Sequence, residues 1–152
     1  MLKAKDIMTP DVITIQAEAT VEELARILIE HKISGVPVVD GNKKILGIVT
    51  ENDLIRKNKR FHIPTVIRLF DAYILLGSGK AEEEIKKMAA TTVDEIYIRK
   101  VVTINEETSM EDIATIMSEQ HVHLLPVLRD ATVVGIVGKA DVVRAMAYED
   151  SK

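Results

Sequence analysis

The chain repeats a long stretch of its own sequence. "VITIQAEATVEELARILIEHKISGVPVVD", which begins at position 12, aligns without a gap with "VVTINEETSMEDIATIMSEQHVHLLPVLR", which begins at position 101, an offset of 89 residues. After the loss of one residue in the next turn, "GIVTENDLIR" at 47–56 aligns with "GIVGKADVVR" at 135–144. A repeat of this length indicates that two copies of one supersecondary unit build the fold.

Each copy has the same expected order of elements, strand–helix–strand–strand–helix. A short β-branched run, at 12–15 and at 101–104, precedes an amphipathic helix. Two strands follow, "GVPVVD" and "KILGIVT" in the first copy and "LLPVLRD" and "TVVGIVG" in the second, and the polar turns between them predict hairpins. A second helix is expected near residue 52 and near residue 140. One such unit is marginal alone, so we expect the copies to pack face to face as one α/β module of the α+β type.

Capping signals mark the start of the first helix in each copy. Thr20 with Glu23, and Ser109 with Asp112, have the spacing at which the two side chains satisfy open backbone donors at a helix start. Apolar residues then recur at helical spacing and form one stripe per helix: Val21, Leu24, Ala25, Ile27 and Leu28, and Met110, Ile113, Ala114, Ile116 and Met117.

Two prolines at equivalent positions limit how the strands can pair. Pro37 and Pro126 have no backbone N–H and cannot donate to a sheet ladder. Each strand is therefore expected to begin at its proline or to run along a sheet edge.

Composition excludes several classes of protein. The 152 residues are 47% hydrophobic and 29% charged, which is typical of a globular domain, and the net charge of −4 argues against a nucleic-acid partner. No apolar run reaches the roughly 20 residues that a membrane-spanning helix needs, so no membrane partner is expected. The absence of cysteine excludes disulfides, thiolate catalysis and cysteine-ligated metals. These features favour a cytoplasmic location.

An unmatched insert at 59–92 separates the copies, which occupy 1–58 and 93–149. The insert has another apolar helical stripe, Ile63, Val66, Ile67, Phe70 and Ile74, and then a charged segment, "GSGKAEEEIKKM". One interpretation is a clasp packed on the core of the protein itself. The other is a lid over a ligand or a contact between two copies of the chain.

The turn that ends each repeat carries the candidate chemistry. Asp53 follows Thr50 by three residues, in the first turn of a helix, and Asp141 follows Gly138 in the same way. A carboxylate there can accept both hydrogens of a ribose diol, while the open N–H groups of the helix start can bind phosphate. The alternative is a capping box that only starts the helix. Gly138 has no capping side chain, so the retained Asp141 favours the diol acceptor.

These residues resemble a known family. The repeated order, the strand starts "SGVPVVD" and "HLLPVLRD", and the turns "GIVTEND" and "GIVGKAD" are similar to the tandem cystathionine-β-synthase (CBS) domain pair, over about 1–57 and 93–148. The resemblance implies two CBS motifs related by a pseudo-twofold axis, with clefts between them for AMP, ADP, ATP or S-adenosylmethionine. It also implies a homodimer that regulates a partner protein and catalyses no reaction.

The resemblance further implies that the turn of one copy works with the strand start of the other. The site at Thr50 and Asp53 would place the adenine base against Val102, Val122 and Leu124. The site at Gly138 and Asp141 would use apolar residues of the first copy and its neighbours: Ile13, Ile33 and Gly35, with Met8 nearby. His123 matches a position at which relatives of the AMP-activated kinase γ subunit contact phosphate, and Ser34 is its counterpart. The hydroxyl missing at Gly138 predicts up to about tenfold weaker binding there.

Other readings of the sequence stay open. His121 and His123 could share a strand face and bind a metal, although a polar strand end is the simpler interpretation of His121. A ligand-free oligomerisation scaffold is the alternative function. Catalytic motifs such as "GxxxxGK[ST]", "GxSxG" and "HExxH" are absent, which argues against an enzyme.

Overall fold

The computed structural model describes residues 1–57 and 91–150. The apolar stripe expected at 63–74 and the charged segment at 77–88 lie outside the described residues. The role of the insert and the repeat boundaries expected at 58 and 92 therefore stay predictions.

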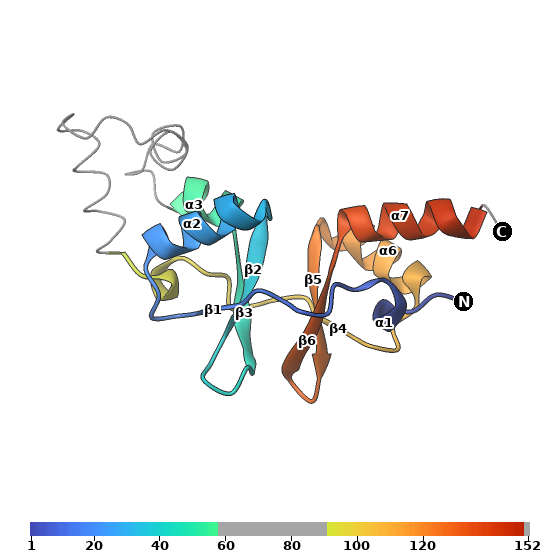
Figure 1. Cartoon of the computed structure of the whole chain (residues 1–152), viewed down its shortest axis with the longest axis horizontal. Helices are drawn as coiled ribbons and strands as arrows, with labels where there is room; N and C mark the ends of the chain where they lie inside the picture. The colour runs from blue at the N-terminus through green and yellow to red at the C-terminus, as the bar shows by residue number, and fades with distance from the viewer. Residues whose placement is uncertain (58–90, 151–152) are drawn as a thin grey trace. The chain divides into compact units, whose positions relative to one another are not determined.

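The described chain contains two three-stranded sheets of the same design, each with its strands in sequence order (Figure 1). Their bounds are β1 (Ile15–Gln16), β2 (Gly35–Val39) and β3 (Ile45–Thr50), and β4 (Ile104–Asn105), β5 (Leu124–Arg129) and β6 (Thr132–Gly138). The first strand of each sheet runs parallel to the second, and β5 and β6 pair antiparallel. The predicted hairpins and the α/β fold are confirmed. The first strands have two residues each, shorter than the four-residue runs expected.

The helices begin where the capping signals predict. The long helices of the repeats are α2 (Val21–His31), α3 (Glu51–Lys57), α6 (Met110–Gln120) and α7 (Lys139–Asp150). Before α2, the Glu23 backbone N–H donates to Thr20 Oγ1 at 3.1 Å and the Thr20 N–H donates to Glu23 Oε2 at 3.3 Å, a complete capping box. Ser109 Oγ likewise accepts from the Asp112 N–H at 3.1 Å before α6.

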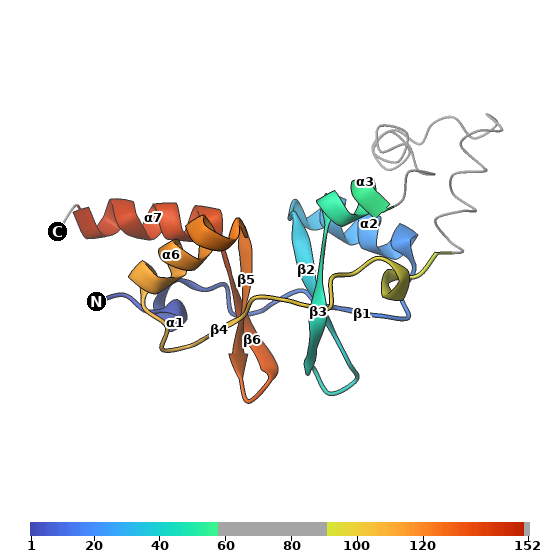
Figure 2. The ribbon, with the colours of Figure 1, turned by 180° about the vertical axis from the view of Figure 1, so that it is seen from behind.

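The elements gather into two compact units that do not follow the repeat boundaries. Unit 1 contains Met1–Ile13, Gly41–Ile45 and the described residues of Lys100–Lys152, and unit 2 contains Thr14–Asp40 and the described residues of Leu46–Arg99. The N-terminal helix α1 (Ala4–Ile7) thus packs with the second repeat, as Figures 1 and 2 show by its place beside α6 and β4. The short 3₁₀ helix η1 (Val93–Glu95) packs with the first repeat.

The segments around α1 and η1, each of which packs with the other repeat, occupy equivalent positions in the two copies. Lys3 forms an antiparallel bridge with Ser109, and Thr92 forms the equivalent bridge with Thr20. Ala4 and Val93, the first residues of α1 and η1, are both fully buried. The duplication therefore extends in the structure to near residue 3, about nine residues before the gap-free alignment that begins at 12, which is consistent with copies that start near residues 1 and 93.

Each unit has an aliphatic core between its sheet and its helices. In unit 1 this core comprises Ala4, Ile104, Ile113, Leu125, Val127, Val137 and Val142. In unit 2 the predicted α2 stripe is buried at Val21, Leu24, Ala25 and Leu28, and the strand residues Val38 and Val49 are buried as well. Each fully buried valine, leucine or isoleucine side chain contributes about 1.5–3 kcal/mol to the stability of its unit. These contacts hold the strand and the helix that flank each candidate turn.

The expectation for the two prolines is wrong. Pro37 and Pro126 lie within β2 and β5, which are the central strands of their sheets. Pro126 stands opposite Ile136, whose N–H and C=O both bond to Thr9 on the other side, at 3.1 and 2.9 Å. The ladder between β5 and β6 thus needs no donor at Pro126. Ile48 makes the same pair of bonds to Ile98 in unit 2, at 3.0 and 2.9 Å.

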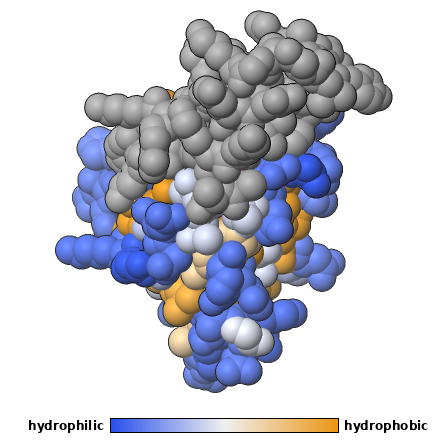
Figure 3. Space-filling view, turned by 90° about the vertical axis from the view of Figure 1, so that its left-hand side faces the viewer, coloured by the Kyte–Doolittle hydropathy of each residue, from blue (hydrophilic) through white to orange (hydrophobic). Residues whose placement is uncertain are grey.

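In the face that Figure 3 shows, hydrophilic residues cover both flanks of the described surface, and hydrophobic residues lie between them. Large apolar side chains are nevertheless exposed on the last helix of each repeat: Ile55 on α3 (54%), and Val143 (59%), Met146 (51%) and Tyr148 (65%) on α7.

Candidate ligand-binding site

The first candidate turn joins β3 to α3 in unit 2. Asp53 Oδ2 accepts from the Thr50 backbone N–H at 2.8 Å and from Thr50 Oγ1 at 3.2 Å. Asp53 is only 1% exposed. The carboxylate therefore links the end of β3 to the start of α3, and it is buried from solvent in this structure.

The second candidate turn joins β6 to α7 in unit 1. Asp141 Oδ2 accepts from the Gly138 backbone N–H at 2.7 Å, and Oδ1 accepts from Arg144 Nη1 at 3.2 Å. The Asp141 side chain is 17% exposed and is the more accessible of the two carboxylates. Because the capping contact uses a backbone N–H, it needs no side chain at Gly138. The inference that a glycine there favours a diol acceptor over a cap is therefore wrong.

Each turn lies beside the start of the central strand of its own sheet. The Glu51 N–H donates to the Ser34 carbonyl at 2.8 Å, which brings Ile33, Ser34 and Gly35 next to the Thr50 turn. The Lys139 N–H donates to the His123 carbonyl at 3.0 Å in the same way. Leu124 Cδ2 is 3.6 Å from the position that a Cβ on Gly138 would take. The Ser34 and His123 side chains are exposed.

A close contact, with backbone at Gly47 and with a side chain at Gly135, explains the glycine that begins each "GIV" sequence. A Cβ on Gly47 would lie 2.2 Å from the Ile98 carbonyl oxygen and 2.6 Å from the Tyr97 ring. A Cβ on Gly135 would lie 2.3 Å from Met8 Sδ. Tyr97 is therefore the counterpart of Met8, and sequence reasoning missed it. The bridges that start the repeat at Lys3 and Thr92 are the signal that reveals this pair.

The remaining predicted residues all lie in unit 1. Met8, Val102 and Val122 are partly buried and pack against the core of unit 1, where Ile13 also lies. The residues expected to contact a base held by Thr50 and Asp53 thus belong to unit 1, whereas this turn belongs to unit 2. The pairing of each turn with the strand start of the other copy stays a prediction.

The histidine pair does not share a strand face. His121 ends α6 in a left-handed conformation with φ 54°, and β5 begins only at Leu124. Lys32 ends α2 in the same conformation, with φ 53°. His121 is therefore a helix C-cap, neither a strand residue nor a polar strand end. Within residues 1–57 and 91–150, no group of three histidine, aspartate or glutamate residues could hold a metal ion.

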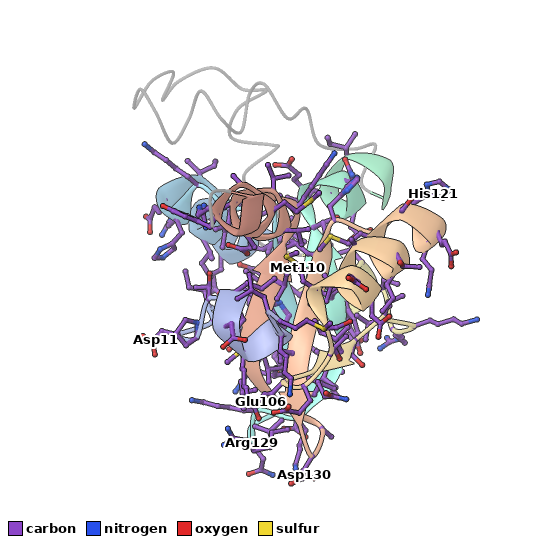
Figure 4. All side chains as sticks on the ribbon, turned by 90° about the vertical axis from the view of Figure 1, so that its right-hand side faces the viewer. Asp11, Glu106, Met110, His121, Arg129 and Asp130 are labelled. Carbon is purple, nitrogen blue, oxygen red and sulfur yellow. The ribbon has the colours of Figure 1, made fainter. Side chains whose placement is uncertain are left out.

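A charged network on the loop after β4 ties the N-terminal segment to the second repeat. Glu107 accepts from Lys3 Nζ at 2.6 Å and from Lys5 Nζ at 2.9 Å, and the hydrogen bonds from these lysines, Lys3 first, lower its pKa to about 2. Arg129 makes a two-pronged contact with Glu106 at 2.8 and 2.9 Å, which Figure 4 shows near the tip of the β5–β6 hairpin. Hydrogen bonding by Arg129 lowers the pKa of Glu106. This network joins segments of unit 1 to one another.

Comparison with known proteins connects these turns to a family. A family model for the CBS domain matches residues 4–60 and 93–148. The chain is 31% identical over 141 residues to L-aspartate semialdehyde sulfurtransferase of Methanocaldococcus jannaschii, and this match spans 92% of the chain but 22% of that protein. No helix in the two described ranges has the length and apolar character needed to cross a membrane.

Solved structures share the fold over nearly the whole chain. The CBS domain of a CBS domain containing membrane protein from Sphaerobacter thermophilus is 28% identical, with a TM-score of 0.79 over 95% of this chain and 87% of that one. The CBS domain pair of protein MJ0100, in complex with 5′-methylthioadenosine and S-adenosyl-L-methionine, is 27% identical, with a TM-score of 0.71 over 98% of each chain.

Proposed function

We propose that this chain, which belongs to the CBS domain family and carries two copies of the domain, is a regulatory module. It binds an adenosine compound and catalyses no reaction. The candidate ligands are AMP, ADP, ATP and S-adenosylmethionine. The observation that carries the proposal is the likeness, over 98% of the chain, to a CBS domain pair in complex with two adenosine compounds.

The two turns supply the chemistry that such a ligand needs. A carboxylate has about four acceptor sites, so the capping bond from Gly138 and the bond from Arg144 leave Asp141 able to accept from a ribose diol. Hydrogen bonds to a charged group contribute about 1.5–3 kcal/mol each, and a micromolar ligand requires about 8 kcal/mol. Two bonds from the diol would supply a third or more of this free energy. Apolar contacts with the adenine base would supply the rest.

The test must separate ligand binding from helix capping, because the same carboxylate can do both. In Asp141→Asn the amide oxygen can still accept from the Gly138 N–H, but the charge and one acceptor are lost. We expect binding of the preferred ligand, measured by titration calorimetry, to weaken at least about tenfold. Asp6→Asn is the matched control, because Asp6 Oδ2 accepts from the Lys3 N–H at 2.9 Å in the same i,i+3 geometry. This control should keep full affinity.

Two results would remove the proposal. One is the absence of heat and of any thermal shift with AMP, ADP, ATP and S-adenosylmethionine at millimolar concentration. The other is an equal loss of affinity in Asp6→Asn and Asp141→Asn, because it would mean that both substitutions act only through stability.

The regulatory step would be a population shift. A ligand that contacts both repeats favours the conformations in which both contacts can form, and a partner protein responds to that shift. The net charge of −4 supports a partner other than nucleic acid, and we place the module in the cytoplasm, away from membranes.

A ligand-free scaffold is the second candidate, and one observation favours it. Three large apolar side chains of α7, Val143, Met146 and Tyr148, are more than half exposed, as expected of a surface that another protein covers. Both functions predict a homodimer, so light scattering that shows a monomer at high concentration would count against both. Only the scaffold predicts that Asp53→Asn and Asp141→Asn change neither ligand binding nor assembly. Steady nucleotide turnover by the pure protein would contradict both candidates.

A further inference from the structure

The two candidate turns carry opposite charges at equivalent positions. Lys139 is the first residue of α7, and its counterpart, Glu51, is the first residue of α3. Both side chains are exposed. The strand start beside Lys139 presents His123, where the strand start beside Glu51 presents Ser34. The turn in unit 1 therefore combines its carboxylate with a lysine and a histidine, whereas the turn in unit 2 combines its carboxylate with a glutamate.

Adenosine compounds differ from one another at the 5′ position of the ribose. AMP, ADP and ATP carry phosphate there, whereas adenosine carries a hydroxyl and S-adenosylmethionine a sulfonium group. A carboxylate that holds the ribose repels a nearby phosphate, and a cation beside it offsets the repulsion. In unit 1, Lys139 lies two residues from Asp141, and its backbone N–H is bonded to His123. In unit 2, Glu51 adds to the repulsion.

The fold itself does not call for a lysine at this position. The first turn of a helix is the positive end of its dipole, so a cation there is unfavourable and an acidic residue is favourable. Three of the other helices follow this rule, with Glu51 and Asp53 in α3, Glu22 and Glu23 in α2, and Glu111 and Asp112 in α6. Lys139 departs from it at an exposed site, where no packing requires it.

We infer that the Gly138–Asp141 turn is selective for phosphorylated adenosine compounds, and that Lys139 determines this selectivity. The inference rests on the proposed function, because it assigns a ligand class to one of its two turns. Asp141 is partly exposed whereas Asp53 is buried, which makes this turn the accessible one. The Thr50–Asp53 turn, with Glu51, disfavours phosphate.

The test compares AMP with adenosine, which share base and ribose and differ only in the phosphate. In Lys139→Glu, we expect the affinity for AMP, measured by titration calorimetry, to fall about tenfold, and the affinity for adenosine to stay within about twofold. The midpoint of thermal unfolding should stay level or rise, because glutamate suits the first turn of α7. A residue with only a structural role would not move affinity and stability in opposite directions. Lys139→Arg should keep the AMP preference, and Glu51→Gln, the matched control in unit 2, should not weaken AMP binding.

Two outcomes would overturn the inference. In the first, Lys139→Glu keeps the wild-type ratio of the affinities for AMP and adenosine, whether or not both affinities fall. In the second, Glu51→Gln lowers this ratio as much as Lys139→Glu does. If neither compound binds the wild-type protein, the proposed function fails, and the assignment fails with it.

Discussion

Replacing Gly138 by serine would restore, in the second repeat, the hydroxyl that Thr50 carries in the first. A Cβ at Gly138 would meet its nearest atoms, Asp141 Oδ2 and Leu124 Cδ2, at 3.6 Å, which is ordinary van der Waals contact. Serine therefore fits this position without displacing a neighbour. Its hydroxyl can donate to Asp141 as Thr50 Oγ1 donates to Asp53 Oδ2 at 3.2 Å.

The expected gain has two parts. Gly138→Ala removes backbone freedom from the unfolded chain and should raise the free energy of unfolding by about 0.4–1 kcal/mol. The serine hydroxyl adds one hydrogen bond, which contributes about 0.5–1.5 kcal/mol. The free energy of unfolding of Gly138→Ser should therefore exceed that of the wild type by about 1–2.5 kcal/mol. If the hydroxyl also contacts the ligand, as predicted from the sequence, the affinities for AMP and adenosine should rise together by up to about tenfold.

Urea unfolding of the wild type, Gly138→Ala and Gly138→Ser separates the two parts. Thr50→Ala is the reciprocal variant and should lose about 1 kcal/mol, because it removes the same hydroxyl from the first repeat. The reasoning fails if serine is no more stable than alanine, since the hydroxyl would then make no bond to Asp141. It also fails if both variants are less stable than the wild type, since a Cβ at Gly138 would then not fit without displacing its neighbours.

Three further results are expected. Gly47→Ala should lower the free energy of unfolding, measured in urea, by at least about 2 kcal/mol, because the new Cβ meets a backbone carbonyl. Gly135→Ala should lower it clearly less, because the side chain of Met8 can move away. Equal losses in the two variants would contradict this. Glu107 has a folded pKa of about 2 against an ordinary value of 4.5, so its contribution to stability is present above pH 4.5 and is lost as the pH falls toward 2. Stability measured across that window should fall less steeply in Glu107→Gln, and parallel curves would count against the ion pairs. Thr20→Ala should cost about 1 kcal/mol through loss of the capping box before α2, and no change would show that the box is dispensable.

Much of the fold could be predicted from the sequence because its signals are local. The capping pair Thr20 and Glu23 lies within one helical turn, and the α2 stripe repeats at helical spacing, so neither depends on distant partners. The hairpins follow for the same reason. The α/β fold then follows from the strands and helices within each repeat.

Features that depend on distant partners were missed or misjudged. Pro126 can pair with β6 because its partner there, Ile136, directs its backbone groups to Thr9, which is remote in sequence. Tyr97 contacts Gly47 because the Ile48–Ile98 bridge joins two segments that are remote in sequence. No local pattern reports such contacts.

The candidate site shows a different limit. The position of Asp141 could be predicted from the repeat, but its contact with Gly138 uses a backbone N–H that almost every residue possesses. A sequence therefore cannot distinguish a capping carboxylate from a ligand-binding one at this position. Variants that keep the cap and remove the second acceptor can make that distinction.

The differences between the two repeats do not all carry the same meaning. Met8 and Tyr97 differ in size and chemistry, yet each lies against the glycine of its own unit, so packing alone explains both. Lys139 and Glu51 differ in the sign of their charge at exposed positions, where neither packing nor helix electrostatics explains the lysine. After a duplication, a difference that the fold does not require is the one that can reflect a different task. This reasoning leads from the repeat to Lys139, and the AMP and adenosine titrations test it.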